Sequence, residues 1–477
     1  MINLCKTKGV PYYRQIANYI EDCIAKGIYP VGMKLHTERE LASILNVNRS
    51  TIHAAYEELR AKGLVERNVS IGTIVAPNDK KAIHYITPPP AISNIQQQQS
   101  ILQQIQTKKQ SQQIINFASA DLSADLQPRS LCAPFDPFLQ PAFDAGHPQG
   151  QEELRHVIAH HMKKYRQIES TANNILVTAG ARQAIYLAAS SLLQKGDAIA
   201  IGNPSFAYTL PIFHENRFKT HFLDIDKEGV NPDQVLSLYK KHRIKMIFIN
   251  PTYQNPTGAR VTLERKKRLY EICPLYGITV VEDDPSNLNS HMYQHEYTLK
   301  SMDDCGIVIY VSSLSKVIGS GAKIGWITAS QPIIDHLTMM KLQMDAGLPH
   351  LSQRVATEVL KAEQFSQHIS NLRLMLNEKK KATTDILKKY FQDELTFYEP
   401  EGGTNLWCKP SEPSFQINEL FKQAAKQNVI FTPGSIFGSN PRYFRISYSA
   451  LDKPDIEKGI ELLHDAYQST LKRQNIQ

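Results

Sequence analysis

The sequence predicts a two-domain α/β protein in which a small winged helix-turn-helix domain precedes a large domain built on a mostly parallel sheet. The first observation is the length, because 477 residues exceed one average domain. The second is that residues 1–76 contain short helical patterns broken by turns. The third is that β-branched runs alternate with amphipathic helical stretches from Asn116 onward, which is typical of a parallel α/β sheet.

The composition is that of a globular protein, with 42% apolar and 21% charged residues. No run reaches the roughly 18 apolar residues of a membrane span, and residues 1–11 have no signal-peptide pattern. The 6 cysteines form no C-x-x-C pair, which argues against a zinc knuckle or a disulfide framework and favours the cytoplasm. The net charge of +8 permits nucleic-acid binding without arguing for it.

Three helical patterns occupy most of the first 76 residues. The first, over residues 12–26, has one apolar side and ends before Gly27. The second begins after Thr37, which is spaced from Glu40 as in a capping box. The third, over residues 49–62, follows a tight turn and an N-cap at Asn48. Two short helices joined by such a turn predict a helix-turn-helix unit, whose second helix can enter the major groove of DNA.

Two short strands complete this domain, over residues 64–66 and 72–75, and together they predict a wing. Arg49, Ser50 and Thr51 lie in the first turn of the third helix. Side chains and backbone N–H groups at this end of a recognition helix reach phosphates and base edges.

The motifs of this domain closely resemble the GntR-type winged helix. They are the strings at residues 11–16, 32–42, 47–52 and 72–75. The resemblance implies a DNA-binding surface made of Thr37, Arg39, Arg49, Ser50, Thr51 and Gly72. The sequence departs from the family at His36-Thr37, where Pro-Ser is usual, and at Ile71, where Gly is usual, and these departures concern details of the operator sequence.

A segment rich in Pro and Gln separates the two domains. It covers residues 77–115 and includes Pro-Pro-Pro at 88–90 and four Gln at 96–99. This composition predicts a linker that is extended at first and helical later. The alternative is a helix packed on a domain, because Ile95, Ile101, Leu102 and Ile105 have roughly helical spacing.

The large domain is assigned to residues 116–477, and polar motifs follow its strands. Lys316 comes after a β-run and is framed by serines and glycines, so a desolvated amine there could attack an aldehyde. The alternative is a solvated lysine in a Ser/Gly loop. Arg445 could clamp a carboxylate with two donors. The strands themselves are expected over residues 175–178, 198–201, 246–250, 279–282 and 308–311.

Other motifs in the loops suit a planar, phosphorylated cofactor. Residues 180–183 open a helix after a strand, so its N–H groups form a phosphate cradle. Phe206 offers an aromatic face, and Asn255 can donate to a phenolic oxygen. Residues 282–285 end a strand with carboxylates, one of which could keep a pyridine nitrogen protonated.

In order and spacing these motifs resemble the fold-type I, aspartate-aminotransferase-like domain that binds pyridoxal 5′-phosphate (PLP), from about Gly150 onward. The resemblance implies that Lys316 is the Schiff-base lysine, that Asn255 contacts the phenolic oxygen and that Phe206 stacks on the ring. Asp284 is expected to pair with the pyridine nitrogen, and Asp283 is the alternative. The remaining implied roles are phosphate binding by Ala181, Arg182, Ser313, Ser315 and Lys323, and binding of an amino acid α-carboxylate by Arg445.

Several positions depart from the aminotransferase pattern. Pro285, Ser286 and Asn287 stand where the family carries a tyrosine after the acidic pair. Lys323 replaces an arginine and loses its bidentate fork. Arg182 stands where glutamine is common, and it either adds phosphate charge or lies at the surface. We therefore expect PLP binding with weak or vestigial aminotransferase chemistry.

A GntR-type winged helix joined by a long linker to such a domain resembles the MocR regulators. The resemblance implies a homodimeric, PLP-dependent transcriptional regulator that binds operator DNA and senses an amino compound or PLP. The alternative is a catalytically active aminotransferase with an accessory DNA-binding module. A third hypothesis, a large domain that only dimerises, is disfavoured because Lys316, Asn255 and Arg445 are all present.

Overall fold

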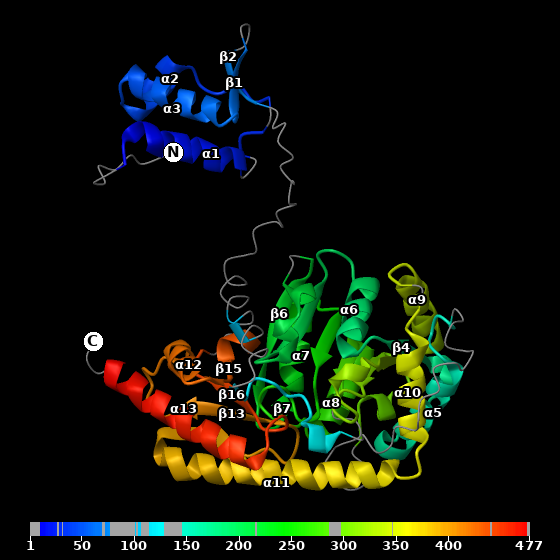
Figure 1. The fold of residues 1–477 in the computed structure, drawn as a ribbon. Coiled ribbons are helices and arrows are strands. Elements are labelled where there is room, and N and C mark those ends of the chain that lie inside the picture. The colour runs from blue at the N-terminus through cyan, green and yellow to red at the C-terminus, as the bar shows by residue number, and fades with distance from the viewer. Residues whose placement is uncertain are drawn as a thin grey trace. The chain divides into compact units, whose positions relative to one another are not determined.

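The chain forms two compact units, Met1–Ile92 and Ser93–Gln477, each described here by itself. The structure is a computed structural model (Figure 1). No helix in the described part of the chain is long and apolar enough to cross a membrane. The described residues are 10–25, 28–30, 32–68, 72–76, 101, 104–105, 114–127, 146–214, 217–285, 297–345, 347–438 and 441–474.

The N-terminal unit is a winged helix-turn-helix, as the sequence predicts. Its core is apolar and includes Ile16, Ile52, Tyr56 and Leu59, each no more than 2% exposed. β1 and β2 pair antiparallel from Val65↔Val75 to Asn68↔Gly72 and form the wing. Ile71 lies outside the described residues. The elements are α1 (Tyr12–Ala25), α2 (Glu38–Leu45), α3 (Arg49–Ala61), β1 (Val65–Asn68) and β2 (Gly72–Val75).

The capping box at the start of α2 is confirmed. The Glu40 N–H donates to Thr37 Oγ1 at 3.3 Å, and the Thr37 N–H donates to Glu40 Oε2 at 2.8 Å. Asn48 occupies the N-cap position of α3, but its side chain makes no capping hydrogen bond.

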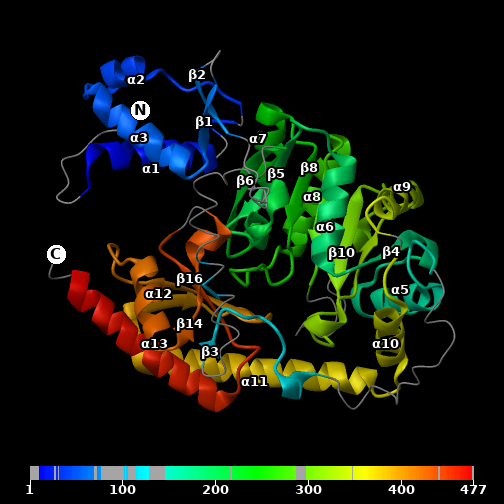
Figure 2. The same cartoon turned by 45° about the horizontal axis from the view of Figure 1, so that its top comes forward.

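A twisted sheet of eight strands forms the centre of the large unit (Figures 1 and 2). Its order is β4-β11-β10-β9-β8-β5-β6-β7, and only β11 and β7 run antiparallel to their neighbours. The predicted strands are confirmed. The bounds are β4 (Ile175–Thr178), β5 (Ala198–Asn203), β6 (Lys219–Asp226), β7 (Gly229–Val230), β8 (Met246–Ile249), β9 (Thr279–Asp283), β10 (Val308–Ser313) and β11 (Gly325–Thr328).

Helices cover both faces of this sheet and give a three-layer α/β/α arrangement. α6 (Ala181–Leu192) and α9 (Gln331–Leu342) pack on the face that carries Val281 and Val311. The opposite face carries Tyr310 and is covered by four other helices. They are α5 (Glu152–Arg166), α7 (Pro232–His242), α8 (Leu263–Leu275) and α10 (His350–Lys361).

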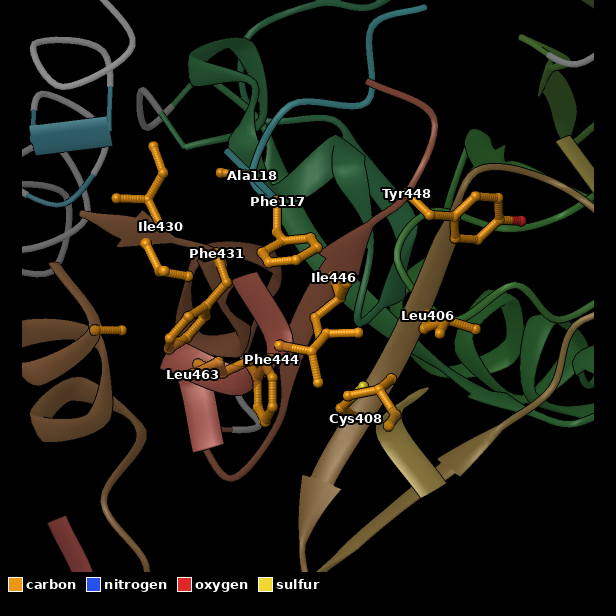
Figure 3. Packing of buried hydrophobic residues seen from close by; sticks show 14 of the residues in the cluster. Phe117, Ala118, Leu406, Cys408, Ile430, Phe431, Phe444, Ile446, Tyr448 and Leu463 are labelled. Carbon is orange, nitrogen blue, oxygen red and sulfur yellow. The ribbon is translucent and has the colours of Figure 1, made fainter. Parts of the chain in front are cut away.

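A second sheet, in the order β12-β13-β16-β15, lies in the C-terminal part of the same unit. One of its faces packs on an apolar core that contains Leu406, Cys408, Phe444 and Ile446 (Figure 3). A short parallel pair, β3 with β14, adjoins this core. The bounds are β3 (Ile115–Asn116), β12 (Leu395–Tyr398), β13 (Asn405–Pro410), β14 (Val429–Ile430), β15 (Thr432–Pro433), β16 (Phe444–Ser447), α11 (Phe365–Phe391), α12 (Ile417–Lys426) and α13 (Lys453–Gln474).

The end of the predicted linker belongs structurally to the large unit. Ile105 is 6% exposed and lies in the same apolar core, and Ile101 packs against that core. Ile115 pairs with Val429 in the short parallel sheet. Burial of these side chains explains why the large unit begins before residue 116, and it agrees with the alternative of a packed helix for Ile101 and Ile105. Ile95 and Leu102 lie outside the described residues.

The Thr37 cap provides a stability test within the winged helix. Thr37→Ala removes the acceptor of the Glu40 N–H, and loss of such a cap costs about 1 kcal/mol. We therefore expect the α2 amides of the full chain to exchange with deuterium about fivefold faster. Thr37→Ser keeps the acceptor and should exchange at the wild-type rate. Equal rates in the alanine variant and the wild type would refute the cap.

Candidate functional site

The predicted DNA-binding residues lie at the start of α2, in the first turn of α3 and at the start of β2. Arg39, Arg49 and Ser50 are exposed, and Thr51 is half-buried. Gly72 begins β2 with φ of 107°, a value that favours glycine. Thr37 Oγ1 accepts from the Glu40 N–H in the α2 cap, a bond that leaves the hydroxyl proton able to donate.

Glu38 joins two side chains of α3 and was missed by the sequence analysis. Its Oε2 accepts from Arg49 Nε at 3.0 Å, and its Oε1 lies 2.9 Å from Nδ1 of His53. The hydrogen bond from His53 and the charge of Arg49 lower the pKa of Glu38. The i,i+4 spacing of Arg49 and His53 places both on one side of the helix and was the available signal. Any anion that bound Arg49 would therefore compete with Glu38 for its guanidinium.

The predicted cofactor residues gather at one edge of the large sheet. They follow β4, β5, β8, β9 and β10, which run parallel, so the carboxyl ends of these strands meet at the same edge. Ligands of open α/β sheets bind in the crevice at this edge.

Arg445 and Asn255 are in direct contact. Arg445 is 7% exposed, and its Nη1 donates to Asn255 Oδ1 at 2.9 Å. Its Nη2 donates to Ala118 O at 2.7 Å and to Thr432 Oγ1 at 3.3 Å. Its Nε is buried without a hydrogen-bond partner, and burial lowers the pKa of the guanidinium to about 10. The group therefore has spare donor capacity in a desolvated position.

Lys316 and Phe206 connect to the same residues. The Lys316 ammonium donates to Ala120 O, two residues beyond the Ala118 carbonyl that Arg445 holds. The Phe206 N–H donates to Asn255 O at 2.9 Å. The structure thus brings together the predicted lysine, aromatic ring, asparagine and arginine. The carbonyls of Ala118 and Ala120 carry no signal in a sequence, because every residue has one.

The two aspartates after β9 point to opposite faces of the sheet, because successive side chains of a strand alternate. Asp283 lies two residues after Val281, so both side chains are on the same face of the sheet, and Val281 packs against α6. Val281 belongs to an apolar cluster against which Phe206 and Ala181 also pack. Val311 is in the same cluster, and Ser313, two residues further along β10, is on the same face as Val311. Asp283 is therefore on the face of the other predicted cofactor residues.

Asp283 is buried in a way that disfavours its charge. It is 4% exposed, and its Oδ1 has no hydrogen-bond partner among the residues that the structure describes. Burial, and then the neighbouring charge of Asp284, raise the pKa of Asp283 to about 8. A cation or a protonated ring nitrogen at this carboxyl would relieve both effects.

Asp284 belongs to a buried ion pair on the opposite face. Its Oδ2 accepts from Arg166 Nε at 2.7 Å and from Arg166 Nη2, and the Tyr310 hydroxyl donates to the same oxygen at 2.8 Å. The side chains of Arg166 and Asp284 are 1% and 0% exposed. The sequence analysis did not identify Arg166 or Tyr310, since neither lies in a recognisable motif.

The N-terminus of α6 forms the predicted phosphate cradle. Gly180 precedes it with φ of 87°, and a Cβ on Gly325 would lie only 2.5 Å from the Gly180 carbonyl carbon. Glycine at 325 therefore lets β11 approach this turn. Arg182 Cζ lies 5.3 Å from the centre of the Phe206 ring.

The serines and Lys323 differ in accessibility. Ser313 is buried, Ser315 is half-buried, and Lys323 is exposed with φ of 52°. Pro285 follows the acidic pair, while Ser286 and Asn287 lie outside the described residues.

Comparisons with known proteins match both units. Residues 140–463 match the family model for aminotransferase class I and II, and residues 12–75 match that for bacterial regulatory proteins of the gntR family. The HTH-type transcriptional regulator YdfD of Bacillus subtilis is 30% identical over 95% of this chain and 96% of its own. The HTH-type transcriptional regulator NorG of Staphylococcus aureus (strain USA300) is 29% identical over 90% of this chain and 98% of its own.

Several solved aminotransferase structures are similar to the chain. An archaeal alanine:glyoxylate aminotransferase has a TM-score of 0.73 and 27% identity, covering 78% of this chain and 95% of its own. LysN, an α-aminoadipate aminotransferase from Thermus thermophilus complexed with N-(5′-phosphopyridoxyl)-L-leucine, has a TM-score of 0.71 and 25% identity, covering 80% and 96%.

The large unit thus has the fold of a PLP-dependent aminotransferase, fused to a DNA-binding domain of the GntR type. The chain belongs to the GntR-type transcriptional regulators that carry an aminotransferase class I and II domain, the MocR architecture.

The Arg166–Asp284 pair yields a prediction about stability. Arg166→Ala leaves a buried carboxylate without its cation, which costs about 3–5 kcal/mol. Urea unfolding of the large unit, followed by the fluorescence of its two buried tryptophans, Trp326 and Trp407, should report this loss, because Trp326 lies in the core that Tyr310 shares.

Two further variants control this measurement. Arg354→Ala removes an exposed arginine that pairs with Glu153 and should change the unfolding midpoint little. Adding Asp284→Asn to Arg166→Ala removes the orphaned charge and should recover part of the loss. Equal midpoints for Arg166→Ala and Arg354→Ala would exclude a stabilising role for the buried pair.

Proposed function

We propose that this regulator binds operator DNA through its winged helix and senses an amino compound or PLP in its large unit. The observation that carries the proposal is the contact chain from Phe206 through Asn255 and Arg445 to the turn that holds Lys316. A domain that served only for dimerisation would need none of these groups in mutual contact.

The residues present fit PLP. Asp283 offers a buried carboxyl oxygen without a partner, as the ring nitrogen requires, and the α6 N-terminus offers backbone N–H groups to a phosphate. When bound, PLP supplies an aldehyde for a lysine and an electron-withdrawing ring. Lys316 would hold the aldehyde carbon, Phe206 would lie against the ring, and Asn255 would donate to its phenolic oxygen. Ala181, Arg182, Ser313, Ser315 and Lys323 would surround the phosphate.

We assign the ring nitrogen to Asp283, the alternative of the sequence analysis, and not to Asp284. Asp283 lies on the α6 face with Phe206 and Ser313, whereas Asp284 already accepts from Arg166 and Tyr310 on the other face. Asp284 Oδ1 is also without a hydrogen-bond partner among the described residues, so the assignment to Asp283 rests on the face of the sheet that it shares with Phe206 and Ser313.

Arg445 would bind the carboxylate of the amino compound. Its buried Nε without a partner and its Nη groups can form the two parallel bonds of an Arg–carboxylate pair. Binding there requires Asn255 Oδ1 or Ala118 O to give up one donor. The ligand class is therefore a small molecule with an amine, to reach Lys316, and a carboxylate.

The assembly is proposed to be a homodimer in the cytoplasm, with two winged helices that read two half-sites. A two-fold dimer matches the symmetry that paired operator half-sites require. Sedimentation of PLP-loaded protein as a monomer at dilute concentration would argue against it.

A catalytically active aminotransferase is the second candidate, favoured by the contact of Arg445 with Asn255 beside Lys316. Sustained keto-acid production at about 1 per second or faster would support it. We expect little turnover, because Pro285, Ser286 and Asn287 supply no tyrosine at the family position. A regulator instead requires reciprocal coupling, in which DNA changes the ligand affinity by the factor by which the ligand changes the DNA affinity.

Absorption spectroscopy of purified protein titrated with PLP tests the cofactor assignment. Lys316→Ala should lose the visible absorption of covalently held PLP and any borohydride-trappable adduct, while DNA binding without ligand stays near the wild-type level. Asp283→Asn should weaken PLP binding and alter the spectrum. Asp284→Asn should alter the spectrum much less than Asp283→Asn, because it acts on the ring only through the charge beside Asp283, and it should lower the stability. A trapped adduct in Lys316→Ala would show that another lysine holds the cofactor.

Binding to a duplex selected by the wild-type protein from a random DNA pool tests the role of Arg49. If Arg49 contacts only phosphate, Arg49→Ala should weaken selected and unrelated duplexes alike and lower the salt slope by roughly one unit. If it reads a base, discrimination should fall by about 1–3 kcal/mol. Arg60→Ala, at the far end of α3, is the matched control. Unchanged affinity and slope would remove Arg49 from the interface.

A further inference from the structure

The turn after β3 is held together by one side chain. Asn116 Oδ1 accepts from the Ala118 N–H at 3.0 Å and from the Ser119 N–H at 3.1 Å. The same turn is closed further on by Ser119, whose hydroxyl donates to Asp121 Oδ2 at 2.7 Å. Side chains of this type fix a local backbone shape by taking over donors that would otherwise remain free.

This shape presents two carbonyl oxygens to the two cations of the site. Ala118 O accepts from Arg445 Nη2 at 2.7 Å, and Ala120 O accepts from the Lys316 ammonium. The cations come from distant parts of the sequence, and both contact this turn. The Lys316 amine must leave Ala120 O and lose its proton before its lone pair can attack an aldehyde, and a carboxylate at Arg445 needs the donor that Ala118 O accepts, so turn and ligand compete for both side chains.

The turn lies directly downstream of the chain that leads from the N-terminal unit. Ile101 and Ile105 of that chain pack on the large unit, and Ile101 contacts the cluster of Trp407, Ile436 and Phe437. The Phe437 ring lies 5.0 Å from Arg445 Cζ. Arg445 therefore contacts the incoming chain directly at Ala118 and indirectly through Phe437.

We propose that Asn116 is a positioning residue that holds the turn against Lys316 and Arg445, and that ligand binding at these cations releases the turn. This inference rests on the proposed function, because it takes PLP and an amino carboxylate as the competitors. The released turn is then the first element of the large unit to respond to the ligand. β3 connects this turn to the preceding part of the chain.

Asn116→Ala tests the competition in the full chain. It removes the acceptor of the Ala118 and Ser119 N–H groups, so the turn is held less firmly in the shape that places Ala120 O against Lys316. PLP then displaces a weaker contact at Lys316. We expect PLP, titrated by absorbance, to bind about fivefold more tightly, the equivalent of roughly one net hydrogen bond. Asn116→Asp keeps an acceptor oxygen and should bind PLP as the wild type does. Asn231→Ala, which removes a similar side-chain acceptor from the Asp233 N–H at the start of α7, is the matched control and should also bind normally.

Hydrogen exchange of residues 114–126 supplies an independent readout. PLP should speed the exchange of this segment in the wild type, and Asn116→Ala should exchange fast with or without PLP. If Asn116→Ala misfolds by circular dichroism, Ser119→Ala, which opens the same turn through another bond, must produce both changes.

The outcomes separate the two proposals. Wild-type protein that never takes up PLP would refute the proposed function. Wild-type protein that takes up PLP with unchanged exchange of residues 114–126 would overturn the role of the turn and leave the proposed function standing. Unchanged PLP affinity in folded Asn116→Ala would do the same.

Discussion

The buried ion pair of Arg166 and Asp284 is the constraint on which the geometry of the candidate site depends. A strand presents successive side chains to opposite faces, so fixing Asp284 on one face fixes Asp283 on the other. Arg166 comes from the end of α5, and together with Tyr310 of β10 it ties that helix and two neighbouring strands to one oxygen. Burying the two charges costs desolvation free energy, but the pair fixes which side chain at the end of β9 faces each side of the sheet.

The consequence for Asp283 is electrostatic. Its carboxyl lies in an apolar layer beside a fixed negative charge, which is why its pKa rises to about 8. In the folded chain the carboxyl is neutral at a pH at which an unfolded chain would ionise it. Stability from this group is therefore fully present below the ordinary pKa of about 4 and is lost as the pH rises through 8. A protonated ring nitrogen would remove the penalty, so cofactor binding should stabilise the protein more at the alkaline end of that range.

The fold and most side chains of the candidate site could be predicted from the sequence alone. The reason is that helical periodicity, the Thr37–Glu40 spacing and the motifs at strand ends are local signals. It was insufficient where a role depends on tertiary contact. The face of Asp283 could be chosen only once the partner of Asp284 was known, and the carbonyls of Ala118 and Ala120 have no signature in a sequence. The choice between a linker and a packed helix at Ile105 stayed open in the sequence, because the burial of Ile105 depends on a core assembled from much later residues.

Both candidate sites hold their ligand-binding cations on acceptors of the protein itself. Arg49 is held by Glu38, Arg445 by Ala118 O and Asn255, and Lys316 by Ala120 O. Binding at either site is then an exchange of one partner for another, which lowers the net affinity gained per contact but keeps the side chains ordered beforehand. The exchange also gives each ligand a structural effect, because the acceptor it displaces is left free to move. In the large unit the acceptors are Ala118 O and Ala120 O, so a ligand that displaced them would free the turn after β3 to move.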